Sequence, residues 1–505
     1  MKKRKIVCIL VFMTIGVFFT TGISQGAVNE LRVAIDLDMV RVDPATLGTT
    51  TDRFLSVNLF NGLLKFKPGT SEIRRDLVES YEVSPDGKVY TFLLRKGVKF
   101  HKGYGELTSS DVKFTIMRHL DPSVRSRDFK SFSIVDHVDA PDTYTVKVFL
   151  KRPSNDFLGI LSYHSGVILS EKAVKELGSK ITTEPIGTGP YQLERRIPGS
   201  EIVMTANEDY FMGPPKIKKL IFKVIPDPSV SVNAVQKGDI DFYHVENIGA
   251  YRGLQKIKDK NFIVLTNQGS LTAYYAYLNC RKEPTKNLKV RQAIAHAIDV
   301  KGIVKSFGGM VRSNPSVFPS MLSSWTDKLP TYKYDVEMAK KLLKEAGYDR
   351  TTKIKVYYVK FGLHEDFAVM VKDYLSKIMD VDLVMLDVST FQQFLKEGKW
   401  DVYSQGLTRA TEDIFASGFF HSKGPGNDTG YENGELDQVI EKADMERDPS
   451  KSKKLYIRMQ EIMAENLPYV PLGEQNTTVI MKKGLKGIIP EAHTGVTKFD
   501  GAYFE

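Results

Sequence analysis

Few residue patterns in this chain of 505 residues could carry out catalysis or hold a metal. Gly22-Ile23-Ser24-Gln25-Gly26 matches the G-x-S-x-G pattern of a nucleophilic serine, but it follows an apolar N-terminal run and not a strand that leads into a helix. The nine histidines include no H-E-x-x-H motif, and His364-Glu365 lacks the second histidine of a zinc site. We therefore predict no catalytic residue and no metal site.

Two glycine-rich segments have the composition of phosphate-binding loops. Gly424-Pro425-Gly426-Asn427 lacks the Lys and Ser/Thr that end such a loop, and Gly187-Thr188-Gly189-Pro190 is too short for a dinucleotide fingerprint. Both are more typical of ordinary turns. The sequence thus predicts no bound cofactor and a protein that is not an enzyme.

The charge pattern argues against a nucleic-acid partner. The chain carries a formal charge of +10, but its Lys and Arg are scattered among Asp and Glu, as in residues 441–448. No basic block follows residue 5. With 42% hydrophobic residues there is enough apolar material for a packed core, so we expect a globular protein with a solvated, charged surface.

The N-terminus is typical of a secretory signal peptide, which we assign to residues 1–27. Four basic residues at 2–5 precede an apolar run at 6–19, shorter than the ~20 residues that span a bilayer. Small residues at 24–27 favour cleavage after Gly26 or Ala27, and Cys8 lies too early to be a lipoprotein cysteine. We expect a periplasmic or extracellular protein, with an uncut N-terminal anchor as the alternative.

Alternating strands and helices must position any binding residues. Residues 81–83 and 89–94 are β-rich and flank Ser84-Pro85-Asp86-Gly87, where Pro at the second and Gly at the fourth position predict a β-turn and a hairpin. Residues 334–347 predict a helix with Asp335 as N-cap and Gly347 at its end. Such alternation is typical of α/β layers.

A series of motifs in a fixed order resembles the family 5 solute-binding proteins, the peptide- and nickel-type receptors of ABC importers. The most characteristic are Pro185-Ile186-Gly187-Thr188-Gly189-Pro190-Tyr191 and Asn466-Leu467-Pro468-Tyr469-Val470-Pro471-Leu472. The others lie at residues 76–80, 84–88, 90–92, 94–101, 107–112, 207–211, 238–241, 290–294, 297–299 and 339–347. Together they are spread in this order from residue 76 to residue 472.

The resemblance implies a two-lobed α/β clamshell, like that of class II periplasmic binding proteins, with an extra α/β domain on the first lobe. The core of lobe I would comprise residues 28–50, 180–265 and 475–505, the extra domain 51–179, and lobe II 266–474. Hinges are expected near 266–274 and 471–475, where closure would bury a small-molecule or peptide solute. The implied partners are the transmembrane subunits of an ABC permease, and the protein is expected to be a monomer.

Three segments would face the cleft by this resemblance. They are the loop after the first strand, the crossover strand and the segment that begins at Trp400. Their candidate ligand-binding residues are Asp38, Met39, Arg41, Tyr274, Tyr275, Tyr277, Trp400, Tyr403, Gln405, Leu407, Thr408, Arg409, Glu412 and Asp413. Strand alternation places Tyr275 and Tyr277 on one face and Tyr274 on the other.

The third segment departs from the peptide-binding members, which carry an acidic residue there for the peptide's α-ammonium group. Ungapped alignment places Ala410 or Thr408 at that position, and only a gap brings in Glu412 or Asp413. Arg409 offers a forked cation suited to a carboxylate or phosphate. We expect a solute with an anionic or polyhydroxyl group. The alternative function is a secreted enzyme or a peptide chaperone on the same fold.

Overall fold

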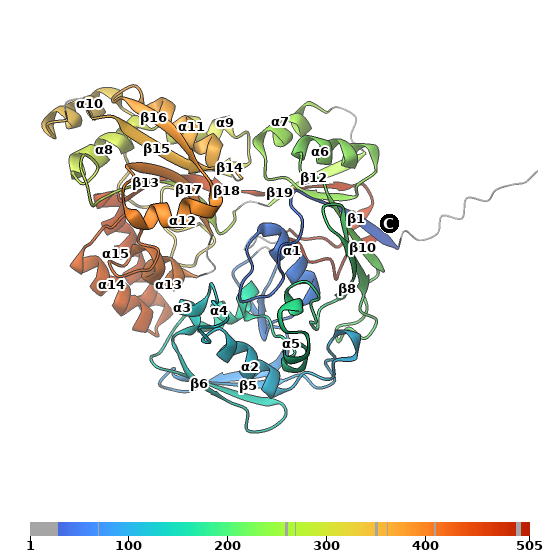
Figure 1. Ribbon diagram of the computed structural model, residues 1–505. Helices are drawn as coiled ribbons and strands as arrows, with labels where there is room; N and C mark the ends of the chain where they lie inside the picture. The colour runs from blue at the N-terminus through green and yellow to red at the C-terminus, as the bar shows by residue number, and fades with distance from the viewer. Residues whose placement is uncertain are drawn as a thin grey trace, which may run out of the picture.

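The computed structural model describes residues 29–505, apart from 69, 258–260, 268, 349–351, 361, 409, 410 and 491–495. The predicted signal peptide therefore lies outside the described residues. Within the described ranges, no helix is both long and apolar enough to cross a bilayer. The chain folds into two α/β lobes, of which the first carries an extra domain (Figure 1).

A seven-stranded sheet forms the centre of lobe I. Its strands are β1 (Glu30–Ile35), β8 (Tyr191–Ile197), β9 (Glu201–Ala206), β10 (Lys219–Val224), β11 (Phe242–His244), β12 (Phe262–Asn267) and β19 (Thr477–Lys482). They lie in the order β12-β19-β11-β1-β10-β9-β8. Strand β1 runs parallel to both of its neighbours, β10 and β11, so three carboxyl ends meet at one edge of the sheet.

Three helices pack on this sheet or beside it, namely α1 (Thr50–Leu59), α6 (Pro228–Lys237) and α7 (Ile248–Lys256). Thr49 and Asp52 form a capping box that starts α1, and the apolar side of α1 joins the lobe I core. A Cβ at Gly187 or Gly189 would lie 2.1 or 2.4 Å from the backbone of Leu59. The backbone at these two positions therefore approaches α1 too closely for any side chain.

The extra domain is built on a four-stranded antiparallel sheet. Its strands are β4 (Val78–Val83), β5 (Val89–Leu94), β6 (Val135–Asp139) and β7 (Thr145–Leu150), in the order β4-β5-β7-β6. Its other elements are β2 (Leu64–Phe66), β3 (Ile73–Arg75), α2 (Ser109–Arg118), α3 (Phe129–Phe132), α4 (Phe157–Ser162) and α5 (Glu171–Leu177). The predicted hairpin is confirmed, because β4 pairs with β5 and Gly87 N donates to Ser84 O at 2.8 Å.

Lobe II contains a six-stranded mixed sheet. Its strands are β13 (Thr272–Leu278), β14 (Val311–Arg312), β15 (Ile354–Val359), β16 (Val381–Leu386), β17 (Val402–Thr408) and β18 (Tyr469–Gln475), in the order β14-β18-β13-β17-β15-β16. Its helices are α8 (Leu288–Ala297), α9 (Val300–Ser306), α10 (Val336–Glu345), α11 (His364–Leu375), α12 (Val388–Glu397), α13 (Glu412–Phe415), α14 (Gly434–Met445) and α15 (Pro449–Asn466). Asp335 caps α10 through a bond from Met338 N, as predicted.

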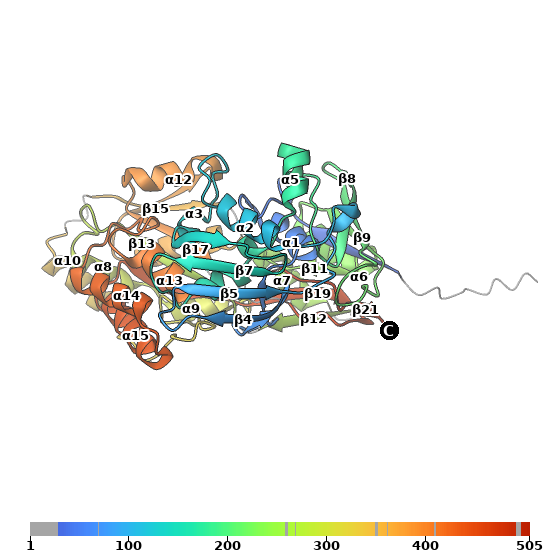
Figure 2. The same cartoon turned by 90° about the horizontal axis from the view of Figure 1, so that it is seen from below.

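Two crossovers connect the lobes, one from β12 to β13 and one from β18 to β19. They run side by side, because β12 pairs with β19 in lobe I and β13 pairs with β18 in lobe II. Figure 2 shows the two lobes from below, with α10, α14 and α15 on the side of lobe II that is turned away from the lobe I sheet.

Lobe II also contacts the extra domain, on the side away from the crossovers. Phe66 and Tyr163 of the extra domain pack against the hydrophobic core of lobe II, and Ile414 packs against the core of the extra domain. Asn155 donates a hydrogen bond to the backbone oxygen of Glu446. The lobes therefore meet on two sides of the central hollow, which is a closed arrangement.

Candidate ligand-binding site

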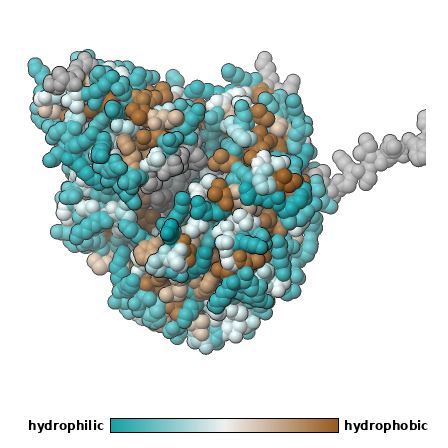
Figure 3. All heavy atoms as spheres, in the orientation of Figure 1, coloured by the Kyte–Doolittle hydropathy of each residue, from teal (hydrophilic) through white to brown (hydrophobic). Residues whose placement is uncertain are grey.

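The surface is hollowed between lobe I and lobe II, next to the loop that follows β1 (Figure 3). In open α/β sheets, ligands bind outside the carboxyl ends of the strands. The carboxyl ends of β1, β10 and β11 form such an edge on lobe I. We therefore take this hollow as the candidate binding cleft.

The three candidate residues in the loop after β1 differ in their contacts and in their exposure. Asp38 accepts hydrogen bonds from Arg196 Nη2 at 2.7 Å and Gly199 N at 2.8 Å. Burial raises the pKa of Asp38, but these hydrogen bonds outweigh burial, so the net pKa is lowered. Met39 is buried in the lobe I core, whereas Arg41 is exposed.

The three candidate tyrosines of β13 are buried on the two faces that alternation predicts. Tyr274 stacks on Phe367 with ring centroids 4.4 Å apart. On the other face, Tyr275 donates to Val317 O at 2.7 Å, and Tyr277 stacks against another ring of that core. All three are at most 3% exposed, so none of them presents its ring to the surface in this closed arrangement.

The segment that begins at Trp400 also divides into buried and half-buried positions. Trp400 is fully buried just before β17 and donates through Nε1 to Leu395 O at 3.2 Å. Tyr403 and Leu407 are buried in the same core. Gln405 and Thr408 of β17 are half-buried, and Thr408 Oγ1 lies 2.6 Å from the hydroxyl of Thr272. Arg409 lies outside the described residues.

Glu412 and Asp413, at the start of α13, already have structural partners. Glu412 Oε1 accepts hydrogen bonds from Ser323 Oγ at 2.8 Å and Ser324 N at 3.0 Å. Asp413 N donates to the carboxylate of Asp156 in the extra domain. Glu412 is thus held within lobe II, whereas the backbone of Asp413 contacts the extra domain and Asp413 Oδ1 is buried.

The structure brings together a cluster of polar side chains at the carboxyl ends of β1 and β11, which was not predicted from the sequence. Burial and, second, repulsion from Glu246 raise the pKa of Asp36 to about 7, while Tyr243 donates to Asp36 Oδ2 at 3.2 Å. His244 Nδ1 lies 3.3 Å from Glu246 Oε1. Polar residues directly after two parallel strands were the available signal.

Two cavities lie outside the cleft. One, of about 580 Å³, opens in lobe II between Tyr332, Leu467 and Pro471. The other, of about 980 Å³, opens in the extra domain beside Lys113 and Glu171. None of the candidate residues lines either cavity. Within the described part of the chain, no group of three or more His, Cys, Asp or Glu is arranged to hold a metal ion.

A family model for bacterial extracellular solute-binding proteins, family 5 (middle region), matches residues 72–427. The chain belongs to this family. The predicted family and the two-lobed α/β fold are therefore confirmed. Members of the family are binding proteins rather than enzymes.

Curated relatives cover almost the whole chain. The di/tripeptide-binding protein 2 of Pseudomonas aeruginosa is 29% identical over 510 residues, with 93% of this chain and 94% of that protein covered. The dipeptide-binding protein of Escherichia coli K12 is 29% identical over 477 residues, with 88% of each covered.

Solved structures agree over a similar length. The periplasmic binding protein DppA of Helicobacter pylori, associated with an ABC transporter and in complex with the peptide STSA, matches with a TM-score of 0.83 and 27% identity, covering 94% of this chain and 98% of that one. MoaA of A. tumefaciens R10, in complex with mannopinic acid, matches with a TM-score of 0.84 and 28% identity, covering 94% and 99%. This family 5 protein is thus a solute-binding receptor of the ABC-importer class.

Proposed function

We propose that this receptor closes lobe I and lobe II over a small solute with an anionic or polyhydroxyl group. It would be secreted through a cleaved signal peptide and would deliver the solute, as a monomer, to the transmembrane subunits of an ABC permease. Contacts that form only in the closed state stabilise that state, so binding and closure are coupled. The domain boundaries given above are part of this proposal, except that α1 (Thr50–Leu59) packs in the core of lobe I and is assigned to that lobe.

The observation that carries the solute class is the placement of the carboxylates of Glu412 and Asp413, of which the first is hydrogen-bonded within lobe II and the second has its Oδ1 buried. Glu412 accepts hydrogen bonds from Ser323 and Ser324. Asp413 Oδ1 is buried, and its carboxyl group lies near Asp156 and Asp444, so neither carboxylate is presented to an ammonium group in the cleft. Arg41 is exposed in the loop after β1. The complex of MoaA with mannopinic acid supports the same solute class.

We assign ligand contacts to Arg41, Gln405 and Thr408, which are exposed or half-buried. Arg409 follows Thr408 directly in the sequence, and we assign it as a contact from that position. Tyr274, Tyr275, Tyr277, Trp400 and Tyr403 would act as the rigid support behind these contacts, since their rings are buried.

Titration calorimetry tests the solute class. Sugar acids, conjugates of sugars with amino acids, and free-amine dipeptides are compared on the wild type and on Glu412→Gln, which keeps an acceptor for Ser324 N but removes the charge. We expect an anionic polyhydroxyl solute to bind equally to both proteins. Glu435→Gln, an exposed carboxylate of lobe II, is the matched control.

Micromolar binding of a free-amine dipeptide to the wild type, lost in Glu412→Gln and kept in Glu435→Gln, would overturn the proposed solute class. Incubation with the bound solute also separates a receptor from an enzyme on the same fold. A receptor returns the solute unchanged in stoichiometric amount and shows a raised melting temperature, whereas an enzyme yields product.

A further inference from the structure

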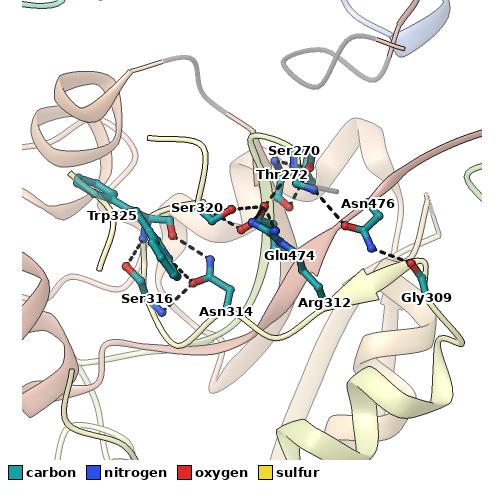
Figure 4. A network of polar contacts seen from close by, with 12 residues as sticks. Ser270, Thr272, Gly309, Arg312, Asn314, Ser316, Ser320, Trp325, Glu474 and Asn476 are labelled. Carbon is teal, nitrogen blue, oxygen red and sulfur yellow. Dashed lines mark hydrogen bonds and ion pairs between the residues drawn. The ribbon is translucent and has the colours of Figure 1, made fainter. Parts of the chain in front are cut away.

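Two side chains near the end of β18, Glu474 and Asn476, tie the crossovers to lobe II (Figure 4). Glu474 is fully buried. Its carboxylate accepts hydrogen bonds from Ser270 N at 3.1 Å, Ser320 N at 2.8 Å and Ser320 Oγ at 2.9 Å. Arg312 Nε donates to the same carboxylate at 3.2 Å, and Arg312 Nη2 lies 3.0 Å away.

Asn476 connects the same segments through uncharged bonds. Gly269 N donates to Asn476 Oδ1 at 3.1 Å, and Asn476 Nδ2 donates to Gly309 O at 2.7 Å. The backbone nitrogen of Asn476 donates to Met310 O at 2.7 Å. The first crossover and the chain before β14 are therefore held by one residue of the second crossover.

We call this set of contacts, from Glu474 and Asn476 to residues 269–270, 309–312 and 320, the crossover clamp. A buried carboxylate is costly unless it is paired and hydrogen-bonded, so the contacts of Glu474 resist separation. The backbone is adapted to the clamp. Gly269 has a φ of +94°, and a Cβ there would lie 3.3 Å from both Arg312 Nη2 and Glu474 Oε1.

We propose that Glu474 is a positioning residue that makes both crossovers part of lobe II, so that hinge bending takes place on the lobe I side of the clamp. On the lobe I side of the clamp, β12 pairs with β19, and β19 also pairs with β11, so both strands belong to the lobe I sheet. Each crossover thus has one end locked to lobe II and the other end locked to lobe I.

The clamp would set the affinity for a solute without touching it. Two crossovers that are locked side by side can bend only together, which narrows the range of open conformations. A narrower range lowers the entropy lost on closure and so strengthens binding. This inference rests on the proposed closure of the cleft, but its test needs no solute.

Pulsed electron paramagnetic resonance of the solute-free protein measures the effect. Spin labels are placed at Met212→Cys in lobe I and Met385→Cys in lobe II, which are 48% and 56% exposed, in a Cys280→Ser background. Glu474→Gln keeps the side-chain shape but removes the charge. We expect a broader distribution of interlobe distances than in the wild type.

Asp241→Asn is the matched control. Asp241 and Glu474 are both fully buried, and each pairs with one arginine. Arg32, the partner of Asp241, is 34% exposed, and Arg312, the partner of Glu474, is 33% exposed. Arg32 and Asp241 both lie in lobe I, so we expect the wild-type distance distribution in this variant.

A second variant, Asn476→Ala, removes only uncharged bonds and reports on the same clamp if Glu474→Gln does not fold. Broadening in the clamp variants, with none in Asp241→Asn, supports the proposal, and about tenfold weaker binding of any solute found by calorimetry would agree with it. Wild-type distributions in both clamp variants, or equal broadening in Asp241→Asn, would overturn it. A failed solute screen bears on the proposed function alone.

Discussion

Asp36 follows β1 where parallel strands of lobe I end, and its carboxyl group is largely removed from water. Burial and then repulsion from Glu246 raise its pKa to about 7, and the hydrogen bond from Tyr243 offsets only part of this effect. Asp38, two residues later, has a lowered pKa, because Arg196 and Gly199 outweigh its burial. Neighbouring carboxyl groups of one loop are thus expected to differ in charge at neutral pH.

Replacing Asp36 by Asn tests this difference through the pH dependence of stability. The folded state of the wild type keeps a proton that the unfolded chain releases above the ordinary pKa of 3.8, so the free energy of unfolding falls as the pH rises toward 7. Relative to that of Asp36→Asn, the free energy of unfolding of the wild type should fall by about 1.4 kcal/mol for each pH unit in this window. Urea unfolding between pH 4.5 and 8 measures the difference.

Asp38→Asn is the control for this titration. Because the folded pKa of Asp38 is lowered, its stabilising contribution is complete above the ordinary pKa and is lost only as the pH falls through the folded pKa. The difference between wild type and Asp38→Asn should stay constant from pH 5 to 8. Parallel unfolding curves for the wild type and Asp36→Asn over the same range would contradict the assignment.

At the scale of single elements, local patterns predicted which side of a strand or helix faces which core. Tyr274 and Tyr275 of β13 lie in different hydrophobic cores, as alternation requires. The burial of these side chains was not predictable, because it depends on β17 and β18. These two strands come from distant parts of the chain and pair with β13 on either side. The sequence likewise predicted a turn at Gly189 but not its contact with α1.

Gly189→Ala should destabilise the protein. The added Cβ would lie 2.4 Å from the backbone carbon of Leu59 and 2.7 Å from Asn58 O, and backbone atoms cannot rotate away as a side chain does. We expect a loss of about 1–3 kcal/mol in the free energy of unfolding, typical of overpacking. Chemical denaturation measures it.

Gly253→Ala provides the opposite case for the same measurement. Gly253 lies within α7, and an added Cβ there meets no described atom within 4 Å. Alanine is the better helix former, so we expect a gain of about 0.4–1 kcal/mol. Equal effects of the two substitutions would show that the close approach at Gly189 does not limit stability.

At the scale of the whole molecule, closure brings carboxyl groups of the extra domain and lobe II together. Asp156 of the extra domain accepts a hydrogen bond from Asp413 N, and burial, then Asp413, Glu412 and Asp444, raise its pKa well above the usual range. Burial and, second, Asp413 raise the pKa of Asp444 to about 8. The other groups that face this cluster are Ser417, Tyr456 and Arg152, of which Ser417 and Arg152 lower the pKa of Asp444.

The compact state should therefore be favoured by protons. Asp156 is buried beside three carboxyl groups of lobe II, which together with burial raise its pKa, so it binds a proton more tightly in the closed state. Closure is therefore favoured at low pH and weakens as the pH rises. Small-angle scattering of the wild type should show a larger radius of gyration at pH 9 than at pH 6. The transition should be smaller in Asp156→Asn.

Asp136→Asn, an exposed carboxylate of the same extra domain, should keep the wild-type pH dependence. A radius of gyration that does not change between pH 6 and 9, with folded protein at both values, would refute proton-linked closure. So would an equal change in Asp156→Asn and the wild type.

Much of the architecture was determined by the sequence alone, because it depends on residues close together in the chain. The turn at residues 84–87 needs only its own four side chains, and Asp335 caps α10 through a nitrogen three residues away. The order of the family motifs added the two lobes and the extra domain. Tertiary structure alone decided which of the candidate residues are buried and which are exposed.

Trp400 was a candidate contact by type and position, but the structure buries it completely against Leu395 O. Glu474 carried no local signal, since its partner Arg312 is 162 residues away and the two meet only when β14 pairs with β18. Burial and long-range pairing depend on the free energy of the whole packed chain. The sequence therefore determined the family and most of the helices and strands. The tertiary structure determined which side chains are buried and which distant residues pair with one another.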